Sequence, residues 1–279
     1  MSMVVFWSPV QGRSGSSTLA LASALTLGFR YRIRQLLTHL GCRGNGPEQG
    51  LSLAGGTGTD NPDYHFSNHG WDAMQRMYLS RSLTKYNFCS YTLPMLEERL
   101  DVLMGIESAD FRYQTDNPAL VNTVMDTASQ YYELVIVDLG SGMLLQEKEL
   151  NVMKKADLVV VSLTQNTSDL DIFFSQEQWP EMLAEKEQLY TIPKYDITSR
   201  FTAANIRRRY DVKQPIYTVP YHTDVMDSWN RKDMKSWVQQ NMNSSRVRSD
   251  WQEGMHDLTK MILENSGLQS ILKQIERGA

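Results

Sequence analysis

Short apolar runs recur along the chain, with helix-like stretches between them. The runs that have strand length occupy residues 4–7, 33–37, 100–104, 134–137, 158–163, 189–192 and 216–219. They are apolar on both faces, which is typical of strands buried in a parallel sheet. Helical patterns at 18–27, 117–131 and 167–183 supply the crossovers that parallel strands require. The pattern predicts an α/β fold: a doubly wound, mostly parallel sheet of about seven strands flanked by helices.

Two further stretches complete the predicted architecture. Residues 41–68 are Gly-rich and have no sustained period, so they are predicted to form a long surface loop. From Val247 onward, apolar positions fall near one face of a helix, which we expect to pack against the sheet. No repeat or linker divides the chain. We therefore expect one domain over residues 1–279, with a helical C-terminal segment from about residue 224.

The composition is that of a globular protein, with 41% hydrophobic and 22% charged residues. The 28 Lys and Arg residues against 32 Asp and Glu residues leave a net charge of −4, so no overall basic excess predicts nucleic-acid binding. Two cysteines are too few for a disulfide framework. No apolar stretch approaches the roughly 18 residues that cross a bilayer, and the first apolar run predicts a strand rather than a leader. We expect a cytoplasmic protein without a transmembrane segment.

A glycine-containing loop lies between the first predicted strand and the first predicted helix, where phosphate-binding loops occur. Gly12 and Gly15 allow backbone N–H groups to turn inward around an anion, and the following helix adds its positive dipole end. Ser17 or Thr18 offers a hydroxyl to Mg²⁺. The alternative is that the hydroxyl residues after Gly15 only cap the helix.

Three later segments have the spacing expected of the same kind of site. Residues 132–142 end an apolar strand in Asp138 and continue into Gly140, which places a carboxylate beside the predicted loop. Residues 156–166 form the next apolar strand, and residues 219–224 end another strand at Pro220. Two of them have a structural alternative, because Asp138 also suits a turn and Pro220 also suits a strand end.

Together these segments resemble the ParA/MinD-type P-loop ATPases, in strand order and over most of the chain. The resemblance implies ATP or ADP as ligand, with Mg²⁺ held by Ser17 and, through water, by Asp138. It implies that Gly140 approaches the γ-phosphate region and that the segment at Pro220 lines an adenine pocket. The residues so assigned to nucleotide binding are Gly12, Arg13, Ser14, Gly15, Ser16, Ser17, Thr18, Gly140, Pro220 and Tyr221.

The chain departs from the family pattern at its charged positions. Gln11 and Ser16 replace the two lysines of the family loop, and Arg13 replaces a glycine and is a candidate substitute cation. After the second strand, residues 36–43 lack the family's Asp-x-Asp. His39 in this stretch is either a proton relay or a packed bystander. With these cationic and acidic groups missing, the resemblance implies weak or lost ATPase activity.

Within the family, the chain is most similar to TadZ-like and related Firmicute proteins, which are associated with pilus or secretion assembly. The resemblance therefore implies a homodimeric positioning or scaffold factor with protein partners, recruited to a membrane-bound assembly. One alternative is a partition-type ATPase that binds DNA non-specifically through Arg207, Arg208 and Arg209. Another is a pseudo-ATPase that binds no nucleotide.

Overall fold

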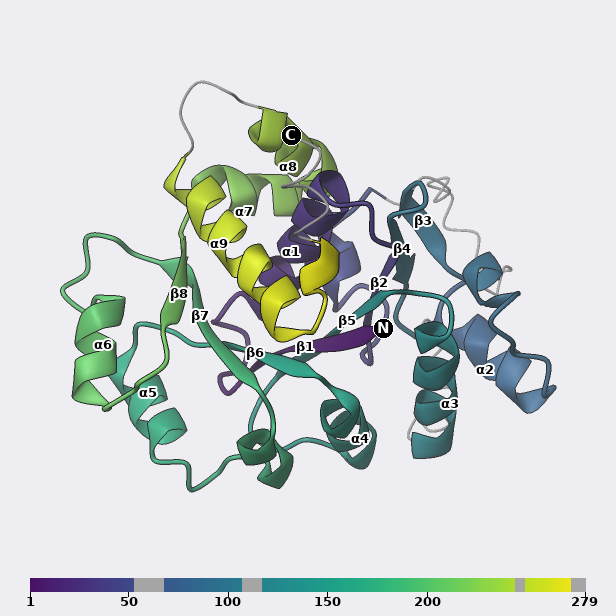
Figure 1. The fold of residues 1–279 in the computed structure, drawn as a ribbon, viewed down its shortest axis with the longest axis horizontal. Helices are drawn as coiled ribbons and strands as arrows, with labels where there is room; N and C mark the ends of the chain where they lie inside the picture. Colours follow the sequence, from purple (N-terminus) through teal and green to yellow (C-terminus); the bar gives the residue numbers. More distant parts are fainter. Residues whose placement is uncertain (53–67, 107–116, 244–248, 272–279) are drawn as a thin grey trace.

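The computed structural model describes residues 1–52, 68–106, 117–243 and 249–271. An eight-stranded sheet runs through the middle of the molecule in the order β3-β4-β2-β5-β1-β6-β7-β8 (Figure 1). Every pairing in it is parallel except that of β3 with β4. The strands are β1 (Ser2–Ser8), β2 (Gln35–His39), β3 (Leu93–Leu96), β4 (Leu100–Leu103), β5 (Leu134–Ser141), β6 (Leu158–Ser162), β7 (Gln188–Tyr195) and β8 (Ile216–Pro220).

Helices cover both faces of this sheet, as the predicted doubly wound fold requires (Figure 1). One face carries α1 (Ser16–Arg30), α7 (Thr223–Asn230), α8 (Met234–Asn243) and α9 (Asp250–Asn265). The other carries α2 (Trp71–Leu79), α3 (Pro118–Ser129), α4 (Glu147–Lys155), α5 (Thr167–Phe174) and α6 (Ala203–Arg209). Three short 3₁₀ turns lie within the described ranges, namely η1 (Pro47–Gly50), η2 (Phe88–Tyr91) and η3 (Glu181–Glu185).

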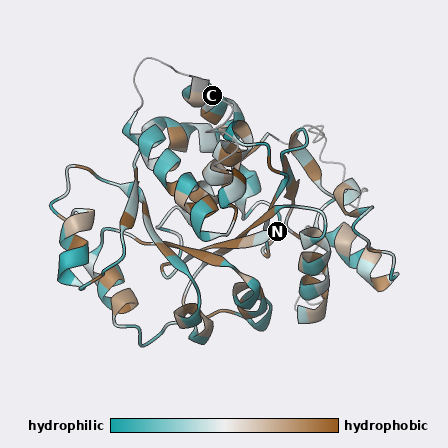
Figure 2. Cartoon of the chain, viewed as in Figure 1, coloured by the Kyte–Doolittle hydropathy of each residue, from teal (hydrophilic) through white to brown (hydrophobic). Residues whose placement is uncertain are grey.

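The central strands are apolar on both sides because each side meets a layer of helices. In β1, Val4 and Phe6 face the core under α1 and α9, whereas Val5 and Trp7 face the core under α3 to α5. Successive side chains of a strand point to opposite faces, so a strand in the middle layer needs an unbroken apolar run. Figure 2 shows the same pattern as a brown sheet between helices of mixed colour.

Helix α9 approaches β8 closely, and a glycine makes this approach possible. A Cβ atom on Gly254 would lie 2.4 Å from the carbonyl oxygen of Thr218, which is shorter than the non-bonded contacts that Cβ atoms make in proteins. The close packing places Trp251 and Met255 of α9 beside the end of β8. The described ranges contain no helix that combines the length and the apolar character needed to span a membrane.

The structure corrects two of the predicted elements and adds a strand. The second strand is shifted from 33–37 to Gln35–His39, since ladder pairing begins only at Gln35 while Ile33 is buried in the connection. The helix predicted over 167–183 ends at Phe174, because Gln176 has a φ of 62° and Pro180 blocks continuation. An eighth strand, β3, was missed. It contains Pro94, which is tolerated there because β3 is the edge strand.

The surface loop predicted over 41–68 is also partly wrong. Residues 53–67 lie outside the described ranges. Gly46, Pro47, Glu48 and Gly50 are buried, and η1 packs against α1 and α7. The glycines of this stretch were interpreted as a sign of an irregular surface, but here they allow the chain to pack tightly into the fold.

Candidate functional site

The loop between β1 and α1 has the backbone shape of an anion cradle. Gly12 has a φ of 74° and Gly15 a φ of 79°, both in the left-handed region that favours glycine. Gly15 is the N-cap of α1 and provides no side-chain hydrogen bond to the first turn of the helix. The leading N–H groups of a 15-residue helix therefore face the loop without a side-chain cap.

The loop is anchored to the two strands that flank β1. The Ser8 hydroxyl donates to the carbonyl of Ser162 at 2.8 Å, at the end of β6. On the other side, the Gly142 amide donates to the Ser8 carbonyl at 2.8 Å, and the Trp7 indole N–H donates to the Gly142 carbonyl at 2.9 Å. These bonds fix where the loop begins, at the carboxyl ends of three adjacent strands, where open α/β sheets bind ligands.

One buried hydroxyl in the loop lacks a partner. Ser16 is 5% exposed, and its Oγ accepts or donates no hydrogen bond among the described residues. An orphaned buried hydroxyl costs about 1–3 kcal/mol, and a ligand bound in the loop would complete its bonding. An anion with several oxygens, such as a polyphosphate, suits this hydroxyl and the uncapped amides beside it.

Asp138 lies at the end of β5, next to the loop, and is 3% exposed. Its carboxylate accepts a hydrogen bond from the Gly140 amide at 3.0 Å and another from Ser17. Burial raises the pKa of Asp138, against the opposing effect of these two hydrogen bonds. The two residues predicted to hold Mg²⁺ therefore lie together, and their hydroxyl and carboxylate oxygens are the ligand type that Mg²⁺ prefers. The Gly140 amide is turned toward Asp138 here.

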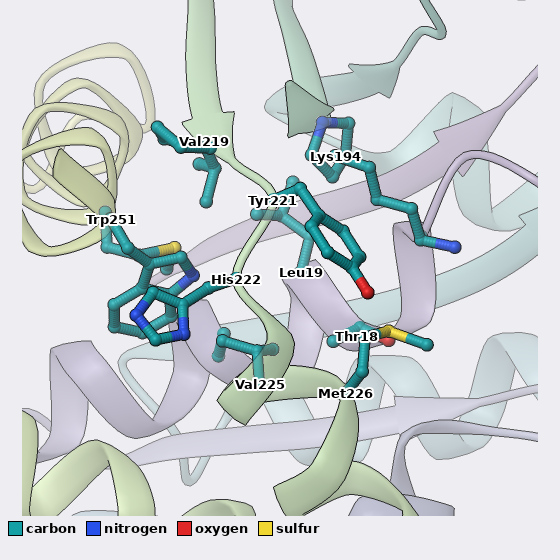
Figure 3. A pocket seen from close by; sticks show the side chains of 14 residues that line it. Thr18, Leu19, Lys194, Val219, Tyr221, His222, Val225, Met226 and Trp251 are labelled. Carbon is teal, nitrogen blue, oxygen red and sulfur yellow. The ribbon is translucent and has the colours of Figure 1, made fainter. Parts of the chain in front are cut away.

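An apolar cleft opens beside the loop and encloses about 380 Å³ of empty space, measured out to its mouth. Gly15 and Thr18 line it from one side, and Pro220 and Tyr221 line it from the other (Figure 3). The deep end is closed by Trp251, which packs edge-on against Trp237 with ring centroids 4.6 Å apart. Two of the predicted phosphate-loop residues, Gly15 and Thr18, thus meet the predicted base-pocket residues at one cleft, although about 200 positions separate them in the sequence.

Tyr221 forms the outer wall of this cleft and is 53% exposed. Its backbone amide donates to the Tyr195 carbonyl at 2.9 Å, which holds the segment after β8 against the end of β7. The next residue, His222, caps α7 by accepting from the Asp224 amide at 3.2 Å. A flat exposed ring above an apolar floor is suited to stacking on a planar ligand.

Arg13, the predicted substitute cation, is engaged elsewhere. Its guanidinium donates to the Asp169 carboxylate at 3.3 Å, in the first turn of α5. Asp169 is 8% exposed and also accepts the Thr164 hydroxyl at 2.8 Å. This ion pair ties the phosphate loop to α5 and occupies the charge that was expected to face a phosphate.

A different cation lies on the loop. Lys194, near the end of β7, lines the cleft, and its stem crosses Gly15 (Figure 3). A Cβ atom on Gly15 would lie 3.0 Å from Lys194 Cε and 3.4 Å from its Cγ. No motif in the sequence points to Lys194, because its place depends on how β7 ends rather than on spacing.

A buried hydrogen-bonded pair, His39 and Glu48, lies at the end of β2. His39 Nε2 lies 2.8 Å from the Glu48 carboxylate, and His39 Nδ1 accepts the Gly41 amide at 3.2 Å. A neutral ring therefore carries its proton on Nε2 and donates it to Glu48. Burial acts to raise the pKa of Glu48, but hydrogen bonds from His39 and the Gly44 amide outweigh it and hold that pKa below its usual range.

The arginines predicted to contact DNA are at the end of α6, and two of the three have partners. Arg207 donates to the carbonyls of Val212 and Lys213, the latter at 2.7 Å. Arg209 lies 3.7 Å from the Asp171 carboxylate. Arg208 is exposed. The cluster closes the loop after α6 and pairs with α5, so less of its charge faces solvent than the sequence implies.

No protein-family model matches the chain, and no curated protein matches it by sequence. Solved structures do. A ParA family ATPase from Chlorobium tepidum is 17% identical, covers 92% of this chain and 98% of its own, and superposes with a TM-score of 0.69. The septum site-determining protein MinD of Pyrococcus horikoshii, complexed with Mg-ADP, is 11% identical, with 94% and 96% coverage and a TM-score of 0.65.

A putative plasmid partition protein from Borrelia burgdorferi, bound to AMPPNP, extends the same likeness. It is 13% identical over 95% of this chain and 99% of its own, with a TM-score of 0.56. At these identities the likeness concerns the fold. The chain has the ParA/MinD-type P-loop fold over nearly its whole length, as the sequence motifs predicted.

Proposed function

We propose that this chain is a ParA/MinD-type protein that binds ATP or ADP with Mg²⁺ at the cleft between the phosphate loop and the segment after β8. The observation that carries the proposal is the uncapped start of α1, with a buried, unpartnered Ser16 hydroxyl in it. Ser17 and Asp138 beside it would hold Mg²⁺, which supplies charge neutralisation for the phosphates. Two structures with this fold contain nucleotides, Mg-ADP in one and AMPPNP in the other.

Each part of the cleft has a separate role in this proposal. The positive-φ glycines shape a loop whose amides receive the phosphates, and the helix dipole of α1 favours their negative charge. Tyr221 covers the base on its exposed side, while Trp251 and Met255 form an apolar floor. The site thus separates an apolar end for the base from a polar end for the phosphates.

Hydrolysis is proposed to be slow or absent. Neither loop lysine of the family is present, since Gln11 and Ser16 occupy those positions. After β2, Glu48 is 4% exposed, and its Oε1 bonds to His39 and to the Gly44 amide. A site without the loop lysines and the Asp-x-Asp of the family is expected to retain binding and to lose rate.

In the cell we propose a positioning or scaffold role in a bacterial assembly of the pilus or secretion type, with the chain acting as a homodimer. Structures with this fold include positioning ATPases and a MinC:MinD complex. Leu144, three residues after the end of β5, is 97% exposed, which is unusual for a large apolar side chain and favours a protein contact there. ATP-dependent dimerisation in sedimentation experiments would support this part.

Equilibrium binding of ATP and ADP, with and without Mg²⁺, tests the nucleotide site. We expect Mg²⁺-dependent binding that Asp138→Asn and Ser17→Ala each weaken by about tenfold or more, because each removes an oxygen ligand. Thr223→Ala, at the exposed start of α7, is the matched loss of a hydroxyl outside the loop and should bind as the wild type does. Absence of binding at millimolar nucleotide would instead favour a pseudo-ATPase that holds partners without nucleotide.

A further inference from the structure

The phosphate loop lacks a cation of its own. Ser16 stands where the family loop carries a lysine, and Arg13 is held by Asp169 at 3.3 Å. A nucleoside triphosphate carries several negative charges, which backbone amides and one Mg²⁺ neutralise only in part. The proposed function therefore needs a positive side chain that reaches the loop from another element.

Lys194 occupies the required place. Its stem lies across the loop glycine that caps α1, with Cε, Cγ and Cδ all within 3.6 Å of where a Gly15 Cβ would be. In Figure 3 the side chain runs away from Trp251 and ends beside the ribbon of the N-terminal segment. Its ammonium makes no hydrogen bond or ion pair with the described residues. It is thus a free charge at the phosphate end of the cleft.

The end of β7 is built so that Lys194 turns toward the loop. Ile192 pairs with Thr218 and Tyr195 pairs with Pro220, so β7 advances three residues while β8 advances two. The extra residue makes a bulge, and Pro193 within it has no N–H to lose from the ladder. A bulge re-aims the side chains beside it. Here it brings Lys194 over Gly15 from a strand that does not adjoin β1.

From these observations we infer that Lys194 supplies the phosphate-binding cation that the loop itself lacks. The inference rests on the proposed nucleotide site and specifies which residue neutralises the phosphates. Its ammonium is a compact point charge with three donors, on a stem long enough to follow phosphates across the loop. Lys194 is a binding and positioning residue in this assignment, and no bond-making step is attributed to it.

The test compares Lys194→Met with the wild type by calorimetric titration of ATP, ADP and AMP in the presence of Mg²⁺. Methionine keeps a stem of similar length over Gly15 and removes only the charge. We expect about a tenfold or greater loss of ATP affinity, a smaller loss for ADP and little for AMP. Lys194→Arg should recover most of the ATP affinity. Lys213→Met, an exposed lysine in the loop before β8, is the control and should bind as the wild type does.

The outcomes distinguish a failure of the Lys194 assignment from a failure of the nucleotide site itself. If the wild type binds ATP and Lys194→Met binds it equally well, the nucleotide site stands and the role of Lys194 is overturned. Equal losses for ATP, ADP and AMP would overturn it as well, since they would indicate a packing role in the cleft. If the wild type binds no nucleotide, the proposed function fails and this inference fails with it. Lys194 is exposed, so the variants are expected to fold, which thermal unfolding checks.

Discussion

Two loops at the same edge of the sheet, the phosphate loop after β1 and the segment after β2, use similar residues in opposite ways. In the phosphate loop, glycines provide positive φ angles, and polar groups such as Ser16 Oγ stay unpartnered. After β2, Gly46, together with Gly105 that follows β4, leaves room for the buried His39 ring, which bonds to the Glu48 carboxylate. The first arrangement leaves a backbone that is open to a ligand, whereas the second, which we call the His39–Glu48 clamp, packs the backbone around a side chain.

The largest loss of stability is expected from adding a methyl group at Gly46, beside the His39 ring. A Cβ on Gly46 would lie 2.5 Å from three atoms of the His39 ring, although the residue's φ of −123° suits any amino acid. Gly46→Ala should therefore destabilise the fold by about 1–3 kcal/mol, because a buried ring must move. Urea unfolding measures the loss. Gly41→Ala, whose Cβ would lie 3.1 Å from the same ring, should cost less.

A double-mutant cycle shows whether the ring is the cause. In a His39→Ala background, Gly46→Ala should cost little, because the space that the ring fills becomes free. An equal cost in both backgrounds would mean that the backbone of η1, and not the ring, rejects the methyl group. The His39 ring would then not be the reason that position 46 requires glycine.

An effect no larger than that of Gly46→Ala is expected when Glu48 loses its charge. Glu48→Gln keeps the shape and removes a charge-assisted hydrogen bond to His39, so we expect a loss of about 1–3 kcal/mol in unfolding free energy. Mg-ATP affinity, measured well below the unfolding temperature, should change by less than about threefold. Unchanged stability with a large loss of affinity would move Glu48 from the clamp to the nucleotide site. Gln49→Glu, at the neighbouring half-buried position, is a control for altered charge in η1.

The sequence predicted those parts of the site that are contiguous at the ends of strands. The glycine loop, Asp138 and the segment at Pro220 each follow an apolar run, and parallel strands bring such ends to one edge. Spacing along the chain is then enough to infer that they meet. The parallel order of the central strands follows from the same regularity.

Contacts that form through irregular geometry escaped prediction. Glu48 meets His39 through a 3₁₀ turn nine residues further on, inside a stretch that was interpreted as a surface loop. Lys194 reaches Gly15 because of one extra residue in β7. Neither a turn that folds back nor a bulge leaves a periodic signal, since both depend on tertiary packing. The ion pair of Arg13 with Asp169 was missed for the same reason.

The smallest losses of stability and ATP affinity are expected for Arg13. This residue and Lys194 are the two cations that were considered as phosphate ligands. Arg13→Ala removes an ion pair whose arginine side chain is 65% exposed, so the stability loss should stay below about 1 kcal/mol. ATP affinity should change by less than about threefold, because the guanidinium is held by Asp169. A tenfold loss in the same titration would mean that Arg13 leaves Asp169 when ATP binds. In that case Asp169→Asn should strengthen ATP binding, and Lys194→Met should have the smaller effect of the two cation removals.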